Sequence, residues 1–159
     1  MRREPSHFNG RTAVASALLM FPDMDRVARK YLLAGLAEQG ITGIKVSTRI
    51  PSPMPDWFIR CFALPGAETT MRTQWVQVIV QVYGTDDEYT SQLARTCAAV
   101  MRNASEMEVD VFDNGEKLYL VSEPIEKNGP FPTDDPDIPD RSLYQVNLVW
   151  TVQSQLYLP

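Results

Sequence analysis

The chain has 159 residues, of which 44% are hydrophobic and 22% are charged. These values suit one soluble domain and argue against a fibrous or mainly disordered chain, because a single core of this length buries enough apolar surface to fold. The apolar stretch at residues 13–21 is too short to span a bilayer, so we expect no membrane association and a cytoplasmic product. Cys61 and Cys97 lack metal-site spacing and are expected to be free buried thiols.

The formal net charge of −5 is distributed unevenly along the chain. Residues 106–140 carry eleven acids against two lysines, whereas residues 1–105 carry twelve basic residues against nine acids. An acidic segment and a more basic body can attract each other between subunits, and a solvated acidic face is the simpler alternative. There is no basic stripe with interleaved aromatic residues, so we expect no direct or sequence-specific binding of nucleic acid.

The first half of the chain predicts a helix followed by two strands. Asp23 is a suitable N-cap for a helix over residues 23–38, which Gly40 ends, and apolar residues recur there at three- and four-residue spacing. Alternation predicts a strand over residues 44–50, after which three prolines prevent strand pairing. A second strand is expected over residues 57–64, ended by Pro65 and Gly66.

The clearest strand is predicted over residues 74–83. Its two faces are Val76, Val78, Val80 and Val82 on one side, and Trp75, Gln77, Ile79, Gln81 and Tyr83 on the other. We expect the valine face to be core and the second face to be partly covered by a partner or a loop. Three acids at residues 86–88 then begin a second helix with an apolar stripe, formed by Tyr89, Leu93, Cys97, Val100 and Met101.

The last third of the chain is expected to be rich in strands. Asn114 and Gly115 predict a hairpin between residues 109–112 and 117–121, a proline-rich acidic loop follows at 129–140, and a strand covers 143–153. The predicted fold is α+β, with a mainly antiparallel sheet of about five strands and two helices packed on one face. Residues 21–159 would form this single domain, after an N-terminal extension over residues 1–20.

The usual sequence motifs of catalytic sites are absent. The sequence contains no phosphate-binding loop, no dinucleotide-binding glycine motif, no nucleophile elbow and no HExxH metal motif. His7 stands alone in a polar segment and is expected to be solvated. Asp134, Asp135 and Asp137 carry carboxylate oxygens, which can bind a hard cation. Their spacing differs from that of a calcium-binding loop, however, and prolines interrupt it. We therefore predict no catalytic residue, no metal and no cofactor.

Two features favour contact with protein instead. The strand face with Trp75, Gln77 and Gln81 suits a partner surface, and the rigid loop at residues 130–139 suits an arm lying on a neighbour, although an inert surface loop is an equal alternative. We expect basic residues of one subunit to meet acids of this loop in the next. The residues concerned are Arg49, Arg60 and Arg141, against Asp134, Asp135, Asp137 and Asp140.

The order of these elements resembles a known family. The sequence Phe21-Pro22-Asp23 opening a helix, Arg49-Ile50-Pro51 after a strand, and Pro55-Asp56-Trp57-Phe58-Ile59-Arg60 resemble the tail-terminator proteins of long-tailed bacteriophages of the actinobacterial siphophage type. Tyr83-Gly84 after the valine-rich strand, Gly129-Pro130, Pro136-Asp137 and Arg141 also fit. The resemblance covers residues 21–153. Residues 1–20 are additional, and Leu64-Pro65-Gly66 stands where many relatives carry paired glycines.

The resemblance implies a virion structural protein, made in the host cytoplasm and placed at the head-proximal end of the tail. It would form a homohexameric ring on the tail tube protein, end tube polymerisation and face the head–tail connector protein. A neck or head-completion protein of the connector is the alternative within phage assembly. A small-molecule-binding or enzymatic domain is the alternative from a different class.

Overall fold

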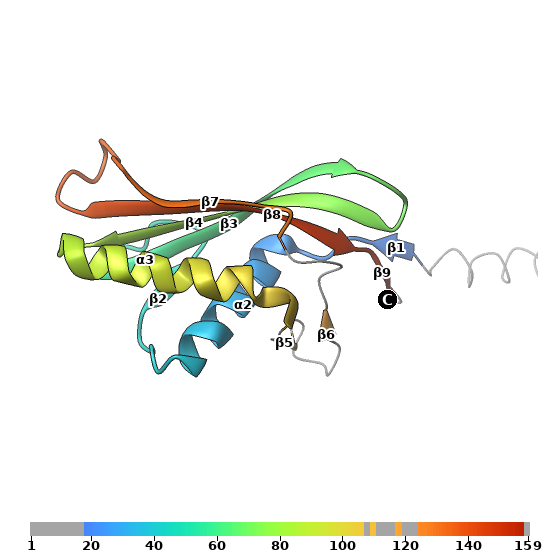
Figure 1. Cartoon of the computed structure of the whole chain (residues 1–159), viewed down its shortest axis with the longest axis horizontal. Coiled ribbons are helices and arrows are strands. Elements are labelled where there is room, and N and C mark those ends of the chain that lie inside the picture. Colours follow the sequence, from blue (N-terminus) through green and yellow to red (C-terminus); the bar gives the residue numbers. More distant parts are fainter. Residues whose placement is uncertain (1–17, 107–108, 111–116, 119–123, 158–159) are drawn as a thin grey trace, which may run out of the picture.

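Alternating side chains build the main sheet of the protein. In the computed structural model, which describes residues 18–106, 109–110, 117–118 and 124–157, five strands pair in the order β2-β3-β4-β8-β7 (Figure 1). They are β2 (Lys45–Ser47), β3 (Trp57–Glu68), β4 (Thr73–Gly84), β7 (Glu126–Thr133) and β8 (Ser142–Gln153). The β2–β3 pair is parallel and the others are antiparallel. The predicted α+β class and its mainly antiparallel sheet are confirmed.

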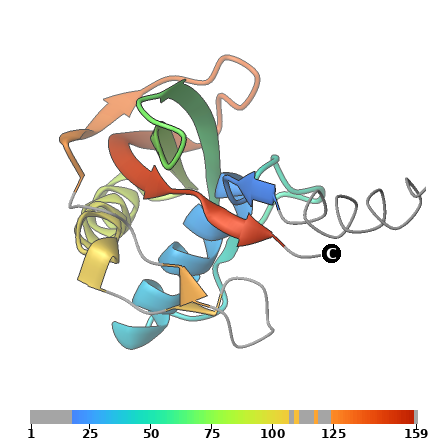
Figure 2. The ribbon, with the colours of Figure 1, turned by 90° about the vertical axis from the view of Figure 1, so that its right-hand side faces the viewer.

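Two helices cover one face of this sheet (Figures 1 and 2). Helix α2 spans Met24–Glu38 and helix α3 spans Asp87–Arg102. The carboxylate of Asp23 accepts a hydrogen bond from Arg26 N at the start of α2, and that of Asp86 accepts one from Tyr89 N at the start of α3. These acceptors satisfy backbone N–H groups that a helix start leaves unpaired. Both predicted helices are confirmed.

Short elements lie at the margins of the two layers. Strand β1 (Leu18–Met20) pairs antiparallel with β9 (Gln155–Tyr157), and β5 (Val109–Asp110) pairs with β6 (Lys117–Leu118). A 3-10 helix, η1, spans Ala104–Glu106. The pairing of β5 with β6 agrees with the predicted hairpin, whose Asn114 and Gly115 lie outside the described residues. Residues 18–20, which we assigned to the extension, belong to β1.

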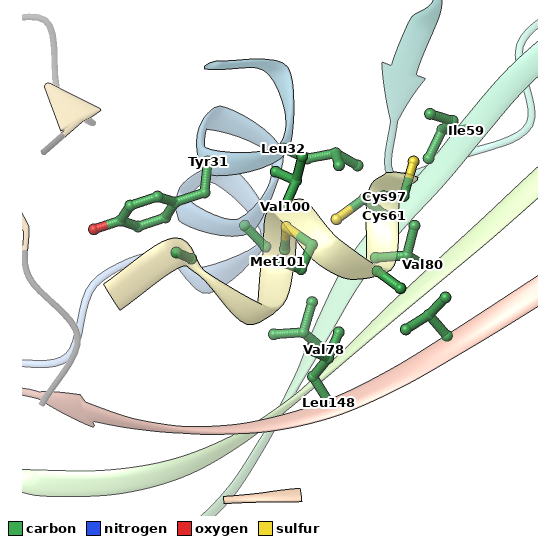
Figure 3. Close-up of a cluster of buried hydrophobic side chains, with 14 of the residues drawn as sticks. Tyr31, Leu32, Ile59, Cys61, Val78, Val80, Cys97, Val100, Met101 and Leu148 are labelled. Atoms are coloured by element: carbon green, nitrogen blue, oxygen red, sulfur yellow. The ribbon is translucent and has the colours of Figure 1, made fainter. Parts of the chain in front are cut away.

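The core lies between the helices and the sheet (Figure 3). The four valines of β4 are fully buried there, as predicted, together with Leu148 and Trp150 of β8. Tyr31 of α2 meets Trp150 edge to face, with ring centroids 5.9 Å apart. The helices also touch each other closely: a Cβ atom added to Gly35 of α2 would lie 2.1 Å from Cγ1 of Val100 in α3. Glycine at this position is required by packing.

Prolines were misread at two places. Strand β3 does not end at Pro65 and Gly66 but continues to Glu68, with an irregular register after Pro65. The first part of the predicted loop at 129–140 is strand β7, which includes Pro130 and Pro132. Both strands have an edge free of neighbours at these positions, and proline is tolerated where its missing N–H would face outward.

Two further predictions were wrong. The strand predicted over residues 44–50 is limited to Lys45–Ser47, because residues 48–51 turn toward the other face of the sheet, where Ile50 packs. Tyr89, which we assigned to the apolar stripe of α3, is 40% exposed, because the first turn of the helix extends past the core. Its ring instead packs edge to face against Trp57, with centroids 5.0 Å apart.

Candidate functional site

The sheet face opposite the helices is open over most of its area (Figures 1 and 2). We call it the open face. Strand register places Arg60, Gln81 and Gln145 in one row across β3, β4 and β8. The next rows are Phe62, Ile79 and Asn147, then Leu64, Gln77 and Val149, then Trp75 and Thr151. The side chains of Leu64 and Trp75 are each 48% exposed, so large apolar groups reach solvent at the end of the face away from the polar row of Arg60, Gln81 and Gln145.

The polar row of the open face is internally hydrogen-bonded. Arg60 Nε donates to the carbonyl of Thr48 at 3.1 Å, and its Nη1 donates to Gln81 Oε1 at 3.2 Å. Gln81 Nε2 then donates to Gln145 Oε1 at 2.9 Å, and Gln145 Nε2 donates to Asn147 Oδ1 at 3.0 Å. The chain of bonds crosses three strands in one direction. Each member has a fixed orientation, so this surface is ordered before any partner binds.

One end of the open face is covered by the protein's own loops. The rings of Phe58 and Tyr83 stack there with centroids 4.7 Å apart, and Ile138 packs on them from the turn between β7 and β8. The hydroxyl of Tyr83 donates to Asp135 Oδ2 at 3.0 Å. Burial, and then the hydrogen bond to Asp135, raise the pKa of Tyr83 to about 12. The expectation of a partly covered face is therefore met at this end by a loop.

Arg141 ties the β7–β8 turn to its own chain. Its Nη1 pairs with Asp140 Oδ2 at 2.7 Å, and its Nη2 donates to the carbonyl of Pro55 at 3.1 Å. The side chain is only 9% exposed. We expected Arg141 to meet acids of a neighbouring subunit, and within the single chain its guanidinium contacts Asp140 and the carbonyl of Pro55. Replacing it would disturb the turn of a single subunit, so it is a poor probe of assembly.

The other candidate residues divide into two groups. Arg60 and Gln81 belong to the hydrogen-bonded row, and Asp135 bonds Tyr83 and the backbone N–H of Asp137. Four candidates remain exposed to solvent, namely Arg49, Gln77, Asp134 and Asp137, and Trp75 is half-exposed. The structure brings Arg60 together with Gln81 and does not bring it to Asp134, Asp135 or Asp137.

The outer edges of the main sheet offer few free donors. Strand β2 pairs only with residues 58–60 of β3, which leaves the rest of that edge uncovered. There the outward N–H of Ala63 donates to Asp25 Oδ1 of α2 at 2.7 Å, and Pro65, two residues on, has no N–H. At the opposite edge, β7 carries Pro130 and Pro132. Such edges resist pairing with another strand, so contacts with other chains are expected on faces and ends.

The described residues contain no arrangement suited to metal chemistry or to a reactive thiol. No group of three or more His, Cys, Asp or Glu side chains among them is placed to hold a metal ion. Cys61 and Cys97 are free and buried, as predicted (Figure 3). Burial raises the pKa of Cys61 to about 12 and also raises that of Cys97, so both thiols are protonated at neutral pH. His7 lies outside the described residues.

Sequence reasoning missed two parts of the molecular surface, the first on the open face and the second on the helix side of the sheet. Alternation placed Gln145 and Asn147 on one strand face, but their bonds to Gln81 depend on strand order and register, which no local pattern contains. The second part is a surface hollow beside Trp57 and Tyr89. The run of acids at residues 86–88 next to an aromatic residue was the available signal, and we interpreted it only as a helix start.

Comparison with known proteins adds no assignment. No protein-family model matches the chain, and no curated protein matches its sequence. Among the described residues, no helix is long and apolar enough to cross a membrane.

Proposed function

We propose that this chain is a virion structural protein, a ring-forming tail terminator of a long-tailed bacteriophage that acts without catalysis. The ring would sit on the last ring of the tail tube protein, end its polymerisation, and meet the head–tail connector protein on its other side. Its place would be the head-proximal end of the tail in the virion. The family part of this proposal rests on the sequence resemblance over residues 21–153.

The observation that carries the assembly role is the open face. A sheet covered by helices on one side and ordered by hydrogen bonds on the other presents a wide, rigid surface to a partner. Trp75 and Leu64 add exposed apolar area on the same face, toward the β3–β4 turn, and protein interfaces favour aromatic residues at their centre. The blunted edges at Ala63–Pro65 and in β7 direct contact to this face and to the ends of the sheet.

A tube-growth assay tests the proposal. Tail tube protein from the same genome is polymerised with and without the purified chain, and tube length is followed by electron microscopy. A terminator binds one end of each tube and stops growth there. Tubes of unchanged length without bound chain contradict the proposal, and binding to the isolated connector without binding to tubes indicates a neck protein.

A matched pair of variants separates the open face from the rest of the surface. Trp75→Ser removes a half-exposed apolar side chain from the open face, and Leu33→Ser removes one of similar exposure, 42%, from helix α2. We expect Trp75→Ser to weaken tube capping on the order of tenfold or more, as central aromatic residues of interfaces do, and Leu33→Ser to cap as the unchanged protein does. Equal activity of both variants removes the open face from the contact.

A further inference from the structure

The two ends of the main sheet differ in charge. Three turns meet at the end where β4 leads into α3, because register pairs Trp57 with Gly84 and Gly84 with Ser142. This acidic end lies on the left in Figure 1 and carries eight acids against Lys45, Arg49 and Arg141. The acids are Asp56, Asp86, Asp87, Glu88, Asp134, Asp135, Asp137 and Asp140. Since Arg141 is already paired with Asp140, the acidic end keeps an excess of negative charge.

A surface hollow of about 600 Å³ opens at the acidic end. Trp57 and Tyr89 line it with their rings at 82° to each other, and Asp56 and Asp86 stand beside them. Asp86 caps helix α3, whereas Asp56 is exposed. Aromatic faces flanked by carboxylates match a guanidinium group, which stacks on rings and pairs with carboxylate oxygens at the same time. The hollow therefore has the chemistry of a receptor for an arginine side chain.

The opposite end of the sheet carries an arginine with the matching character. The turn between β3 and β4 exposes Met71, at 77%, and Arg72. No hydrogen bond or ion pair holds the guanidinium of Arg72 among the described residues. The turn itself is well ordered, because Thr70 Oγ1 lies 2.8 Å from Thr73 Oγ1 and Ser154 N donates to the carbonyl of Arg72 at 2.8 Å.

Geometry prevents the two ends of one chain from meeting. Strand β4 begins next to Arg72 and ends at Gly84, and its twelve residues span roughly 40 Å at the usual rise of a strand. A contact between Arg72 and the hollow must therefore join two copies. A head-to-tail contact of this kind is heterologous, because it joins two different surfaces. Repeated contacts form a closed ring when the rotations between successive copies add up to a full turn.

We propose that the β3–β4 turn of one copy docks into the hollow at the acidic end of the next copy. Arg72 lies against Trp57 and Tyr89 and pairs with Asp56, while Met71 packs on the aromatic edge, where a thioether is favourable. This inference rests on the proposed self-assembly and names its contact. The occupant is a second copy of this chain, chosen because the guanidinium of Arg72 complements the carboxylates beside the hollow, while Glu68 leaves the β3–β4 hairpin neutral overall.

Charge reversal across the contact tests it in the full-length chain. Arg72→Asp and Asp56→Arg are made singly and together, and the association of each is measured by sedimentation. We expect each single variant to associate on the order of tenfold or more weakly, because like charges then face each other, and the double variant to recover most of the loss. Arg95→Asp is the control, since it makes the same charge change on the exposed side of α3.

Four results decide the matter. Recovery in the double variant, with Arg95→Asp unchanged, supports the contact, and thermal melting checks that every variant is folded. Equal assembly of the wild-type protein and of Arg72→Asp overturns this contact. The proposed function is then left standing. A double variant that is folded but as weak as the singles also overturns the contact. An unchanged protein that stays monomeric with tail tube protein present overturns both proposals.

Discussion

The two faces of the main sheet are built from alternate residues of the same strands, yet they are specified in different ways. On the covered face, Val76, Val78, Val80 and Val82 are fully buried against the helices. On the open face, the side chains of Arg60, Gln81, Gln145 and Asn147 are held by directed hydrogen bonds and remain partly solvated. The covered face is defined by shape and volume, and the open face by the register that brings amide groups together.

On the contact surface that we propose, this difference would favour a specific partner. A paired amide row leaves few donors free for an unrelated chain, and a partner must match its fixed pattern. The apolar residues Leu64 and Trp75 lie at the far end of the same face. Substitutions on neighbouring residues of one strand can therefore separate folding from assembly.

The largest expected effect comes from adjacent residues of β8 that face opposite ways. Leu148→Ala on the covered face should lower the free energy of unfolding by about 2–5 kcal/mol, because Leu148 is fully buried and its loss leaves a cavity. Val149→Ala on the open face should cost less than about 1 kcal/mol. Urea unfolding measures both. Equal losses would mean that both faces are packed alike.

A smaller effect is expected where the two helices touch. Gly35→Ala would place a methyl group against Val100, and overpacking of this kind costs about 1–3 kcal/mol, offset in part by the better helix propensity of alanine. Adding Val100→Ala should relieve the clash, so the double variant should be more stable than the sum of the single losses predicts. Strictly additive losses in urea unfolding would place the two residues out of contact.

The covered end of the open face gives a prediction for alkaline pH. The pKa of Tyr83 rises from 10.0 to about 12 in the folded protein, so folding favours the protonated phenol. This contribution is complete below pH 10 and is lost as the pH rises from 10 to about 12. Tyr83→Phe should therefore show a shallower fall of stability in this range. Identical pH profiles for the two proteins would contradict the assigned environment of the phenol.

The smallest effect on stability is expected within the amide row. Gln81→Ala removes the acceptor of Arg60 and the donor to Gln145. Water can replace both on a partly exposed surface, so the loss should be about 1 kcal/mol or less. Capping of tail tubes should fall more than this stability loss accounts for. A variant that is less stable but caps tubes normally would show that the row serves folding alone.

Local patterns predicted the helices and β4 because their signals are local. Asp23 and Asp86 mark helix starts that need only the following turn, and the alternating valines of β4 need only one covered face. Pro65, Pro130 and Pro132 were misread because proline is compatible with a strand only at an edge, and strand order is a non-local property. For the same reason local patterns could not predict the hydrogen bonds of the polar row or the contact of Arg141 with the carbonyl of Pro55, since both depend on residues distant in the sequence.

The mass of the assembled protein tests the central claim most directly. Light scattering of the purified chain, alone and with tail tube protein, should give a closed oligomer at six times the chain's 18.0 kDa, with a mass that stays constant as concentration rises further. A closed ring has this property because its contacts are all satisfied. A mass of 18.0 kDa at every concentration, with the tube protein present as well as absent, would contradict the account.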